Sequence, residues 1–287
     1  MSLSTSLKND IENRLAVKIK DTSAVSGGDI NQVYRLDTSS GPFLLKVNNK
    51  DAFPGMFAHE AQGLSAIRQT ESIAVPDVIY QGYAGKESYL LLEWVETWYP
   101  SDKASKNLGR QLAAVHEHTA EQFGFHQDNY MGSLPQKNNR HNTWSDFFVE
   151  ERLKPMVKLA TDAGQLDAKD QESFDQLYEK LPDLYPEEPP ALVHGDLWSG
   201  NYLISTKQQP YLIDPAVSYS NREFDIAMTA LFGGFDAAFY KAYNDAYPLQ
   251  TGWQGRLKIW NLYPLLVHVN LFGGGYANQV RQILAAI

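Results

Sequence analysis

The sequence predicts a two-lobed α+β fold, in which a small antiparallel β-sheet lobe with one helix is followed by a larger, mainly helical lobe. Short β-prone runs separated by turn residues dominate the chain up to Thr97. From Ser105 onward, apolar residues recur at the spacing of helix faces. Pro100 interrupts the pattern between the two parts. We therefore expect one lobe over residues 1–97 and a second over residues 98–287.

The amino-terminal lobe is expected to be mainly β with one embedded helix. The runs expected to form strands are 33–36, 43–47, 78–80 and 88–95. Residues 39–42 (SSGP) and 82–86 (GYAGK) supply turns that join these runs as hairpins. Between the hairpins, residues 57–68 place their apolar side chains on one side of a helix.

The carboxy-terminal lobe is expected to be helical apart from two short apolar runs. The residues that share one face of its first helix are Leu108, Leu112, Val115 and His116. Residues 147–160 and 172–181 also have helical spacing. The exceptions are residues 192–194 (LVH) and 211–214 (YLID), which indicate buried strand ends. Polar residues follow both runs, which makes these two segments candidates for a catalytic or binding role.

Composition excludes several classes of function. The chain carries 25 Lys and Arg against 34 Asp and Glu, a net charge of −9, which argues against non-specific binding to nucleic acid or anionic lipid. It has no cysteine, which excludes disulfides, thiolate zinc sites and a cysteine nucleophile. No window approaches the ~20 apolar residues of a membrane helix, and residues 1–13 lack a signal-peptide core. We expect a cytoplasmic protein without nucleic-acid or membrane partners; its oligomeric state stays open, with a monomer as one option.

The strongest chemical signal is the segment 194–201, HGDLWSGN. Asp196 and Asn201 are five positions apart after an apolar run, which is the spacing of the kinase catalytic loop. Phosphoryl transfer needs a carboxylate that orients the attacking hydroxyl and accepts its proton, and an oxygen ligand for the magnesium ion on the phosphates. We assign Asp196 as the base and Asn201 as a Mg²⁺ ligand.

Asp214 provides a second oxygen ligand. It follows Asn201 by thirteen positions, at the end of an apolar run, in the sequence IDPA. It takes the place of the Asp in the kinase DFG motif, although Pro-Ala replaces Phe-Gly. A single Asp in such a region would more simply cap a turn. The combination of the two segments instead favours a kinase that uses ATP and Mg²⁺, within a protein-kinase-like fold.

Lys46 is a candidate phosphate ligand in the amino-terminal lobe. It lies in the predicted strand 43–47, where an ammonium can neutralise the α- and β-phosphates of ATP. Glu60 follows on the predicted helix and is expected to pair with Lys46. Taken alone, Lys46 would be an ordinary strand-edge lysine and Glu60 a solvated helix residue.

Two further segments are candidate nucleotide contacts. Gly28, in the turn 27–31 (GGDIN), would cover the phosphates with backbone N–H groups, although a full glycine-rich motif is absent. Glu93, Trp94 and Val95 lie where a hinge strand would read adenine, through the carbonyl of Glu93 and the N–H of Val95. The alternative for the second segment is a plain core strand.

Weaker signals lie elsewhere. The sequence His116-Glu117-His118 suggests a metal site, but alternate helix positions point to different sides, so we set that interpretation aside. Asp225, at the start of a helical run, is expected to brace the catalytic loop rather than contact substrate. The glycine-rich stretch 272–276 indicates a turn between two helices, with His268 and Asn270 as candidate substrate contacts.

Together these motifs resemble the fructosamine kinase (ketosamine-3-kinase) family, within the aminoglycoside-phosphotransferase and choline-kinase group. The segments that carry the resemblance are 128–136 (DNYMGSLPQ), 192–201 (LVHGDLWSGN), 213–216 (IDPA), 221–228 (NREFDIAM) and 268–276 (HVNLFGGGY). The Trp-Ser pair inside the His-Gly-Asp loop, at Trp198 and Ser199, separates this family from its antibiotic-kinase relatives. The resemblance covers almost the whole chain.

The resemblance implies ATP-dependent phosphorylation of a sugar hydroxyl on a ketosamine, with a role in deglycation of free or protein-bound amines. It implies ribulosamines and erythrulosamines as preferred acceptors over fructosamines. The family's base falls on Asp196, its magnesium ligands on Asn201 and Asp214, and its phosphate lysine on Lys46. Trp198 would wall the sugar pocket, with a core tryptophan as the equal alternative. The chain lacks the cysteine that some relatives carry, which excludes thiol regulation here.

Two other functions stay open from sequence. One is a kinase for another hydroxyl compound, such as an aminoglycoside, choline or a sugar. The other is a non-catalytic nucleotide-binding protein, although such proteins usually lose the lysine, the base or the metal-binding Asp. Here Lys46, Asp196, Asn201 and Asp214 are all present.

Overall fold

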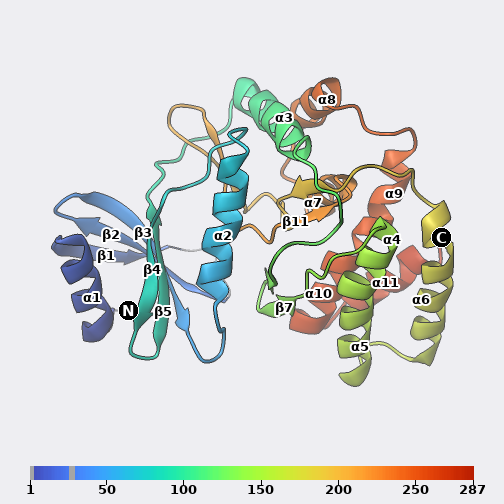
Figure 1. The fold of residues 1–287 in the computed structure, drawn as a ribbon, viewed down its shortest axis with the longest axis horizontal. Coiled ribbons are helices and arrows are strands. Elements are labelled where there is room, and N and C mark those ends of the chain that lie inside the picture. The colour runs from blue at the N-terminus through green and yellow to red at the C-terminus, as the bar shows by residue number, and fades with distance from the viewer. Residues whose placement is uncertain (1–2, 26–29) are drawn as a thin grey trace.

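The computed structural model describes residues 3–25 and 30–287, and Figure 1 shows two lobes side by side. The elements of the amino-terminal lobe are α1 (Thr5–Leu15), β1 (Ile19–Ala24), β2 (Gln32–Thr38), β3 (Gly41–Asn49), α2 (Met56–Gln69), β4 (Val78–Ala84) and β5 (Glu87–Glu93). The strands form a five-stranded sheet in the order β1-β2-β3-β5-β4, with every neighbouring pair antiparallel. The predicted antiparallel sheet is confirmed.

The alternation of side chains along the strands decides what each face of this sheet contacts. On β5, Tyr89 and Leu91 join a core cluster with residues of α1, whereas Leu90 and Leu92 join a cluster with residues of α2. The two helices therefore cover opposite faces, and α2 lies between the sheet and the second lobe (Figure 1). Lys46 on β3 points toward α2 by the same alternation.

The prediction of a single helix in this lobe is wrong, because α1 precedes the sheet. Its only fully buried side chains are Leu7 and Ile11, four positions apart, while charged residues fill the other faces. Ser4 caps its first turn by accepting a hydrogen bond from the N–H of Leu7. The predicted strand 78–80 also continues to Ala84, so the hairpin turn lies at residues 85–86 and not at 82–86.

The carboxy-terminal lobe is mainly helical, as predicted. Its helices are α3 (Asp102–His116), α4 (Trp144–Phe147), α5 (Lys154–Asp162), α6 (Ala168–Lys180), α7 (Glu223–Leu231), α8 (Ala237–Ala246), α9 (Trp253–Trp260), α10 (Leu262–Phe272) and α11 (Tyr276–Leu284). A π-helical turn, Phe148–Leu153, joins α4 to α5, and a 3₁₀ turn, Leu181–Asp183, follows α6. Its short strands are β6 (Asn129–Met131), β7 (Leu134–Gln136), β8 (Ala191–Val193), β9 (Tyr202–Ile204), β10 (Pro210–Leu212) and β11 (Ser218–Ser220).

Large aromatic side chains form the centre of this lobe. The rings of Trp144 and Phe148 meet that of Trp260 edge-on, with centroids 5.6 and 5.4 Å apart. Edge-to-face contacts of this kind add about 0.5–1.5 kcal/mol to the burial of each ring. Trp144, Phe148 and Trp260 are all nearly inaccessible to solvent. This core fixes the helices on which the short strands rest.

The short strands position the loops between them. β8 pairs with β11, and β9 pairs with β10. The segment between β8 and β9 is the predicted catalytic loop, and the segment between β10 and β11 carries Asp214. The main chain joins these two segments, because the N–H of Ile213 donates to the carbonyl of Asn201 at 3.0 Å.

Residues 94–101 connect the two lobes. Trp98 donates its N–H to the carbonyl of Ile204 at 2.8 Å, and Thr206 donates to the carbonyl of Glu96 at 3.0 Å. The connection is therefore paired with the β9–β10 hairpin of the second lobe, and a boundary at residue 97 stays a prediction. Within the described parts of the chain, none of the helices is both long and apolar enough to cross a bilayer.

Candidate active site

A cavity of about 900 Å³ brings the predicted site residues of both lobes together. The sequence-predicted residues that line it are Lys46, Glu60, Asp196, Trp198, Asn201, Asp214 and His268. Residues far apart in the chain meet here, since Lys46 directly contacts Asp214, which lies 168 positions later. The residues that the sequence spacing indicated therefore line one cavity.

Lys46 is buried between two carboxylates. Its Nζ lies 2.7 Å from Glu60 Oε1 and 2.6 Å from Asp214 Oδ1, so the predicted pair with Glu60 is confirmed. Burial alone would lower the pKa of Lys46, but the charges of Asp214 and Glu60 outweigh it and raise the pKa above its ordinary value. The ammonium therefore stays charged and fixed in place, as a phosphate ligand requires.

The surroundings of Glu60 disfavour its charged form, whereas those of Lys46 favour the charged ammonium. Burial raises the pKa of its carboxyl, the ammonium of Lys46 opposes the rise, and the charge of Asp214 adds to it. Two carboxylates share one ammonium in this arrangement. A cation or a phosphate group that draws Asp214 or Lys46 away would change the balance, so this triad is sensitive to what the cavity holds.

The predicted catalytic loop, residues 194–201, packs tightly against the segment that carries Asp214. Gly195 has φ +85°, and a Cβ at this position would lie 2.1 Å from the carbonyl oxygen of Ala216. Only glycine meets both conditions. The loop then returns so that Asn201 Nδ2 donates to the main-chain oxygen of Asp196 at 2.7 Å and to its Oδ2 at 2.9 Å. Asn201 thus holds the carboxylate that is the predicted base.

The carboxyl group of Asp196 has a raised proton affinity. Burial is the main cause, the charges of Asp214 and Asp225 add to it, and the hydrogen bond from Asn201 opposes it, which together raise the pKa of Asp196 to about 8. A group that takes a proton from an alcohol works best when its pKa is near the working pH. The environment of Asp196 fits this task.

Asp214 and Asn201 offer a suitable set of oxygen atoms for Mg²⁺. The Asp214 side chain is 38% exposed to the cavity, and the amide nitrogen of Asn201 is used by Asp196, which leaves the amide oxygen for a ligand. Mg²⁺ prefers oxygen ligands and is commonly held by one or two protein groups together with substrate phosphates. Asp214 also has φ +57°, uncommon for a residue other than glycine and typical of functional positions.

Asp225 braces the loop from the side away from the cavity. From the first turn of α7, its Oδ2 accepts the N–H of His194 at 2.7 Å and its Oδ1 accepts the N–H of Gly195 at 2.8 Å. Burial opposes the charge of Asp225, but hydrogen bonds from His116 and Gly195 outweigh it and lower the pKa. This confirms the bracing role expected from sequence.

His194 links the two loops through its side chain. Its Nε2 lies 2.8 Å from the carbonyl of Ile213, and its Nδ1 accepts the N–H of Asp196 at 3.2 Å. These partners require the tautomer with the proton on Nε2. Burial lowers the pKa of His194, which keeps the ring neutral in this role.

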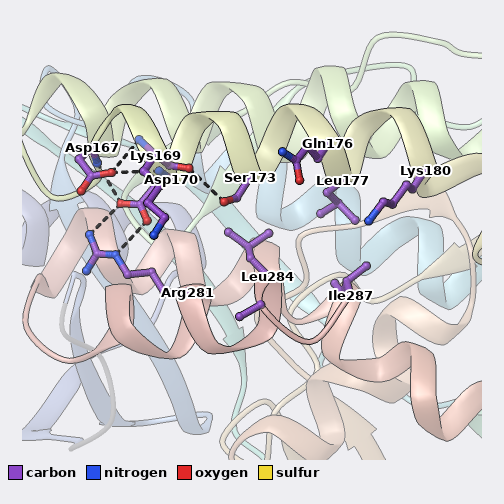
Figure 2. Close-up of a pocket in the computed structure, with 11 residues that line it drawn as sticks. Asp167, Lys169, Asp170, Ser173, Gln176, Leu177, Lys180, Arg281, Leu284 and Ile287 are labelled. Atoms are coloured by element: carbon purple, nitrogen blue, oxygen red, sulfur yellow. Dashed lines mark hydrogen bonds and ion pairs between the residues drawn. The ribbon is translucent and has the colours of Figure 1, made fainter.

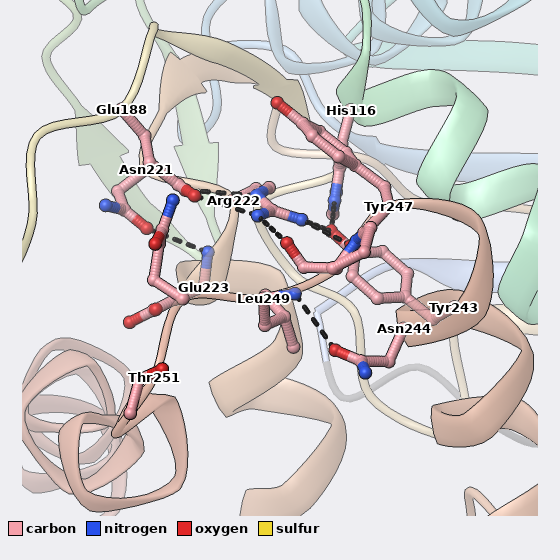
Figure 3. Close-up of polar contacts among 12 residues, drawn as sticks. His116, Glu188, Asn221, Arg222, Glu223, Tyr243, Asn244, Tyr247, Leu249 and Thr251 are labelled. Atoms are coloured by element: carbon pink, nitrogen blue, oxygen red, sulfur yellow. Dashed lines mark hydrogen bonds and ion pairs between the residues drawn. The ribbon is translucent and has the colours of Figure 1, made fainter.

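Sequence reasoning missed the network behind Asp225, which Figure 3 shows. His116 is fully buried, with Nε2 3.2 Å from Asp225 Oδ2 and Nδ1 2.7 Å from the hydroxyl of Tyr243. Behind it, Arg222 forms a two-pronged ion pair with Glu188, at 2.8 and 3.0 Å. His116 therefore supports the loop, whereas His118 lies near Ser72. The motif NREFDIAM, which carries Arg222, was the available signal.

Trp198 and His268 line the cavity, whereas Asn270 does not. Trp198 is 38% exposed, and its ring covers Gly200, where a Cβ would lie 2.2 Å away; it is a cavity wall rather than a core residue. The amide of Asn270 donates to the carbonyls of Met156 and Leu266 at 3.0 and 2.9 Å. The prediction for Asn270 is wrong because a residue two positions from His268 faces the other side of α10.

The further predicted nucleotide contacts, of Gly28 with the phosphates and of residues 93–95 with adenine, stay predictions. Gly28 lies outside the described residues. Glu93 ends β5, so Trp94 and Val95 follow the strand instead of continuing it to residue 95. The N–H of Glu93 donates to the carbonyl of Asp77 at 2.8 Å, and the ring of Trp94 lies under the guanidinium of Arg35. Neither contact uses the carbonyl of Glu93 or the N–H of Val95, the two groups expected to bind adenine.

A second cavity, of about 520 Å³, lies between α6 and α11 (Figure 2). Arg281 pairs with Asp170 there at 2.7 Å. The cavity contains none of the predicted site residues, so the cavity between the lobes is the candidate active site.

Comparisons with known sequences agree with the motifs. The family model described as fructosamine kinase matches residues 2–287. A protein named "Probable ketoamine kinase" from Enterococcus faecium is 42% identical over 262 residues, which cover 91% of this chain and 92% of that protein. "Protein-ribulosamine 3-kinase, chloroplastic" from Arabidopsis thaliana is 36% identical over 274 residues, which cover 94% of this chain and 83% of that protein.

Solved structures give the same grouping. The crystal structure titled "putative fructosamine-3-kinase" from Thermobifida fusca has a TM-score of 0.89 and 34% identity, covering 99% of both chains. Aminoglycoside phosphotransferase APH(4)-Ia has a TM-score of 0.66 at 16% identity, covering 99% of both chains, which shows a shared fold. The two-lobed, protein-kinase-like fold is thereby confirmed. The chain belongs to the fructosamine kinase family.

Proposed function

We propose that this protein transfers the γ-phosphoryl group of ATP to a sugar hydroxyl of a ketosamine, with Mg²⁺ as cofactor. The observation that carries the proposal is the convergence of Lys46, Asp196, Asn201 and Asp214 on one cavity. The names of two relatives, a probable ketoamine kinase and a protein-ribulosamine 3-kinase, support a ketosamine as acceptor.

In the proposed reaction the acceptor oxygen forms a bond to the γ-phosphorus, the bond to the β,γ-bridging oxygen breaks, and ADP leaves. Asp196 orients the hydroxyl and accepts its proton. Lys46, which Glu60 holds at 2.7 Å, binds the phosphates of the nucleotide. Asn201 and Asp214 would hold Mg²⁺, which when bound neutralises charge on the phosphates.

The acceptor would lie against Trp198. An aromatic face suits the C–H surface of a sugar, and this ring is both exposed and fixed by its contact with Gly200. We further propose ribulosamines and erythrulosamines as better acceptors than fructosamines. Phosphorylation at the third carbon would give an unstable product that releases the amine, and this chemistry would amount to deglycation.

The experiment is ADP release across acceptors of different sugar length. Ribulosamine, erythrulosamine and fructosamine carrying the same amine are compared with an aminoglycoside, choline and free ribose, with and without Mg²⁺. The proposal expects turnover with ketosamines only in the presence of Mg²⁺, with a new phosphate ester on the sugar and subsequent release of the free amine. Turnover confined to the aminoglycoside, choline or free sugar would assign a different acceptor.

A binding measurement separates the enzyme from a non-catalytic nucleotide-binding protein. Thermal unfolding with ATP is compared in the presence and absence of Mg²⁺. Stabilisation by ATP that does not depend on Mg²⁺, together with no turnover of any acceptor, would favour the non-catalytic alternative.

A further inference from the structure

Five aromatic rings of the carboxy-terminal lobe line the cavity together. We call them the aromatic rim: Trp198, Phe232, His268, Phe272 and Tyr276. His268 lies at the centre of the last four, with its ring centroid 5.0 Å from that of Phe232, 5.5 Å from Phe272 and 4.9 Å from Tyr276. These four rings thus form a connected aromatic surface, and Trp198 lines the same cavity.

The rim leaves large apolar rings open to solvent. Phe232 is 44% exposed, Phe272 is 55% exposed and Trp198 is 38% exposed. A single exposed aromatic residue needs no explanation. A group of them around a cavity, rather than in a core, is characteristic of a surface that contacts a ligand.

The rim is joined directly to the catalytic loop. Phe232 directly follows α7 in the chain, and two residues later Gly234 approaches Ser199 so closely that a Cβ on Gly234 would lie 2.3 Å from that side chain. The segment carrying Phe232 is therefore held against the loop that carries Asp196 and Trp198. Whatever extends from an acceptor at Asp196 past Trp198 meets this surface.

The charged side chains of the cavity lie outside the rim. The Lys, Asp and Glu side chains of the lining are Lys46, Glu60, Asp196 and Asp214, which belong to the phosphate site. The rim itself contains no Lys, Arg, Asp or Glu. His268 Nδ1 lies 2.7 Å from the carbonyl of Pro264, so this nitrogen carries a proton, and in the tautomer protonated only there Nε2 is a hydrogen-bond acceptor.

We propose that the aromatic rim binds the substituent on the nitrogen of the ketosamine, and that the substrates are ketosamines whose amine carries an apolar or aromatic group without a nearby carboxylate. This inference rests on the proposed function. In a 3-phosphorylated ketosamine three carbon atoms separate the reacting oxygen from the nitrogen, so the nitrogen substituent leaves the sugar pocket close to Asp196. The ring faces attract the secondary ammonium through cation–π contacts, and His268 Nε2 can accept its N–H. A carboxylate next to the nitrogen would lose part of its hydration against the rings without gaining a cationic partner in the rim.

The test uses three ribulosamines that share one sugar and differ on the nitrogen: N-benzyl, N-propyl and N-carboxymethyl. Calorimetry with a non-hydrolysable ATP analogue and Mg²⁺ measures binding, and ADP release measures turnover. We expect Kd to rise at least tenfold from N-benzyl to N-carboxymethyl, with N-propyl between them. Phe272→Ala and Phe232→Ala should each reduce the preference for N-benzyl, measured as the Kd of N-carboxymethyl divided by the Kd of N-benzyl, about fivefold to tenfold. Tyr83→Ala, which removes a 51% exposed ring from β4, serves as the matched control and should leave the ratio unchanged.

The two proposals fail in different ways. Equal affinity for the three compounds, or an unchanged ratio in both folded Phe variants, overturns the assignment of the rim even if all three are phosphorylated. An absence of ADP release with every ketosamine contradicts the proposed function, whatever the binding data show. Circular dichroism checks the fold of each variant, and Phe232→Leu and Phe272→Leu replace any alanine variant that unfolds.

Discussion

Asp196 and Asp225 lie on the two sides of one loop, and their pKa values are shifted in opposite directions. Asp196 faces the cavity, accepts a side-chain hydrogen bond from Asn201, and has a pKa raised to about 8, chiefly by burial. Asp225 is completely inaccessible to solvent, and its pKa is lowered, because hydrogen bonds from His116 and two main-chain N–H groups outweigh burial. Burial alone therefore does not decide the state of a carboxyl group; the number of donors around it does.

The contrast distinguishes a carboxyl group suited to acid–base catalysis from one suited to a structural role. A carboxylate surrounded by donors is stable as an anion and has little tendency to take a proton, which suits a structural anchor. A carboxyl group with few donors and other carboxylates nearby binds a proton readily, which suits a base. The loop presents Asp196, the carboxyl group with few donors, to the cavity. Asp225, the carboxylate surrounded by donors, holds the loop from the opposite side.

The largest expected effect is on turnover, in Asp196→Asn. The amide cannot accept the proton of the acceptor hydroxyl, so kcat should fall by a factor of about 10²–10⁴. The melting temperature at pH 5, where the raised pKa keeps Asp196 protonated, should stay close to that of the parent protein. ADP release under saturating substrate and thermal unfolding measure the two quantities. Asp175→Asn, an exposed change on α6, is the control. Near-normal kcat in Asp196→Asn would show that another group accepts the proton.

Asp225→Asn should affect both stability and turnover. The carboxylate accepts main-chain N–H groups on both oxygens, and an amide replaces one acceptor with a donor that faces an N–H. We expect a loss of about 3 kcal/mol in the free energy of unfolding, as for other buried charged groups that lose a partner. Urea unfolding measures it, and kcat should fall because the loop loses its anchor. A variant with parental stability would remove Asp225 from the anchoring role.

Arg222→Lys tests whether the network behind Asp225 matters at a distance from the cavity. Arg222 pairs with Glu188 through two nitrogens and donates to the carbonyls of Tyr247 and Pro248 at 2.7 and 2.6 Å (Figure 3). Lysine cannot reproduce this planar set of donors, so we expect a loss of about 2 kcal/mol in the free energy of unfolding. KM values should stay unchanged, because Arg222 does not line the cavity. Unchanged urea unfolding would contradict the assigned role.

The separation of contacting residues along the chain explains which parts of the two sides of the loop could be predicted from sequence. Asp196, Asn201 and Asp214 lie within nineteen positions of one another, so their spacing is visible in the chain, and the Lys46–Glu60 pair spans fourteen positions. His116 meets Asp225 across 109 positions, and no local pattern reveals such a contact. Helix α1 was missed for a different reason, since only Leu7 and Ile11 are fully buried among its mainly polar residues. The aromatic rim draws on separate segments and becomes visible only in the folded chain.

The pH dependence of stability should have opposite signs for the two aspartates. The pKa of Asp196 is raised to about 8, so its contribution to stability is present below the unfolded value of about 4 and is lost as the pH rises through about 8. The pKa of Asp225 is lowered, so its contribution is present above about 4 and is lost only as the pH falls further.

Between pH 5 and 8, Asp196→Asn should therefore flatten the decline of stability with rising pH, and Asp225→Asn should lower stability by a similar amount at each pH. Urea unfolding at pH 5, 6, 7 and 8, with EDTA and without nucleotide, measures both curves, and Asp175→Asn should follow the parent protein. Parallel curves for the parent and Asp196→Asn would mean that this carboxyl is already ionised near pH 5. Its environment would then resemble that of Asp225, and the distinction between the two sides of the loop would fail.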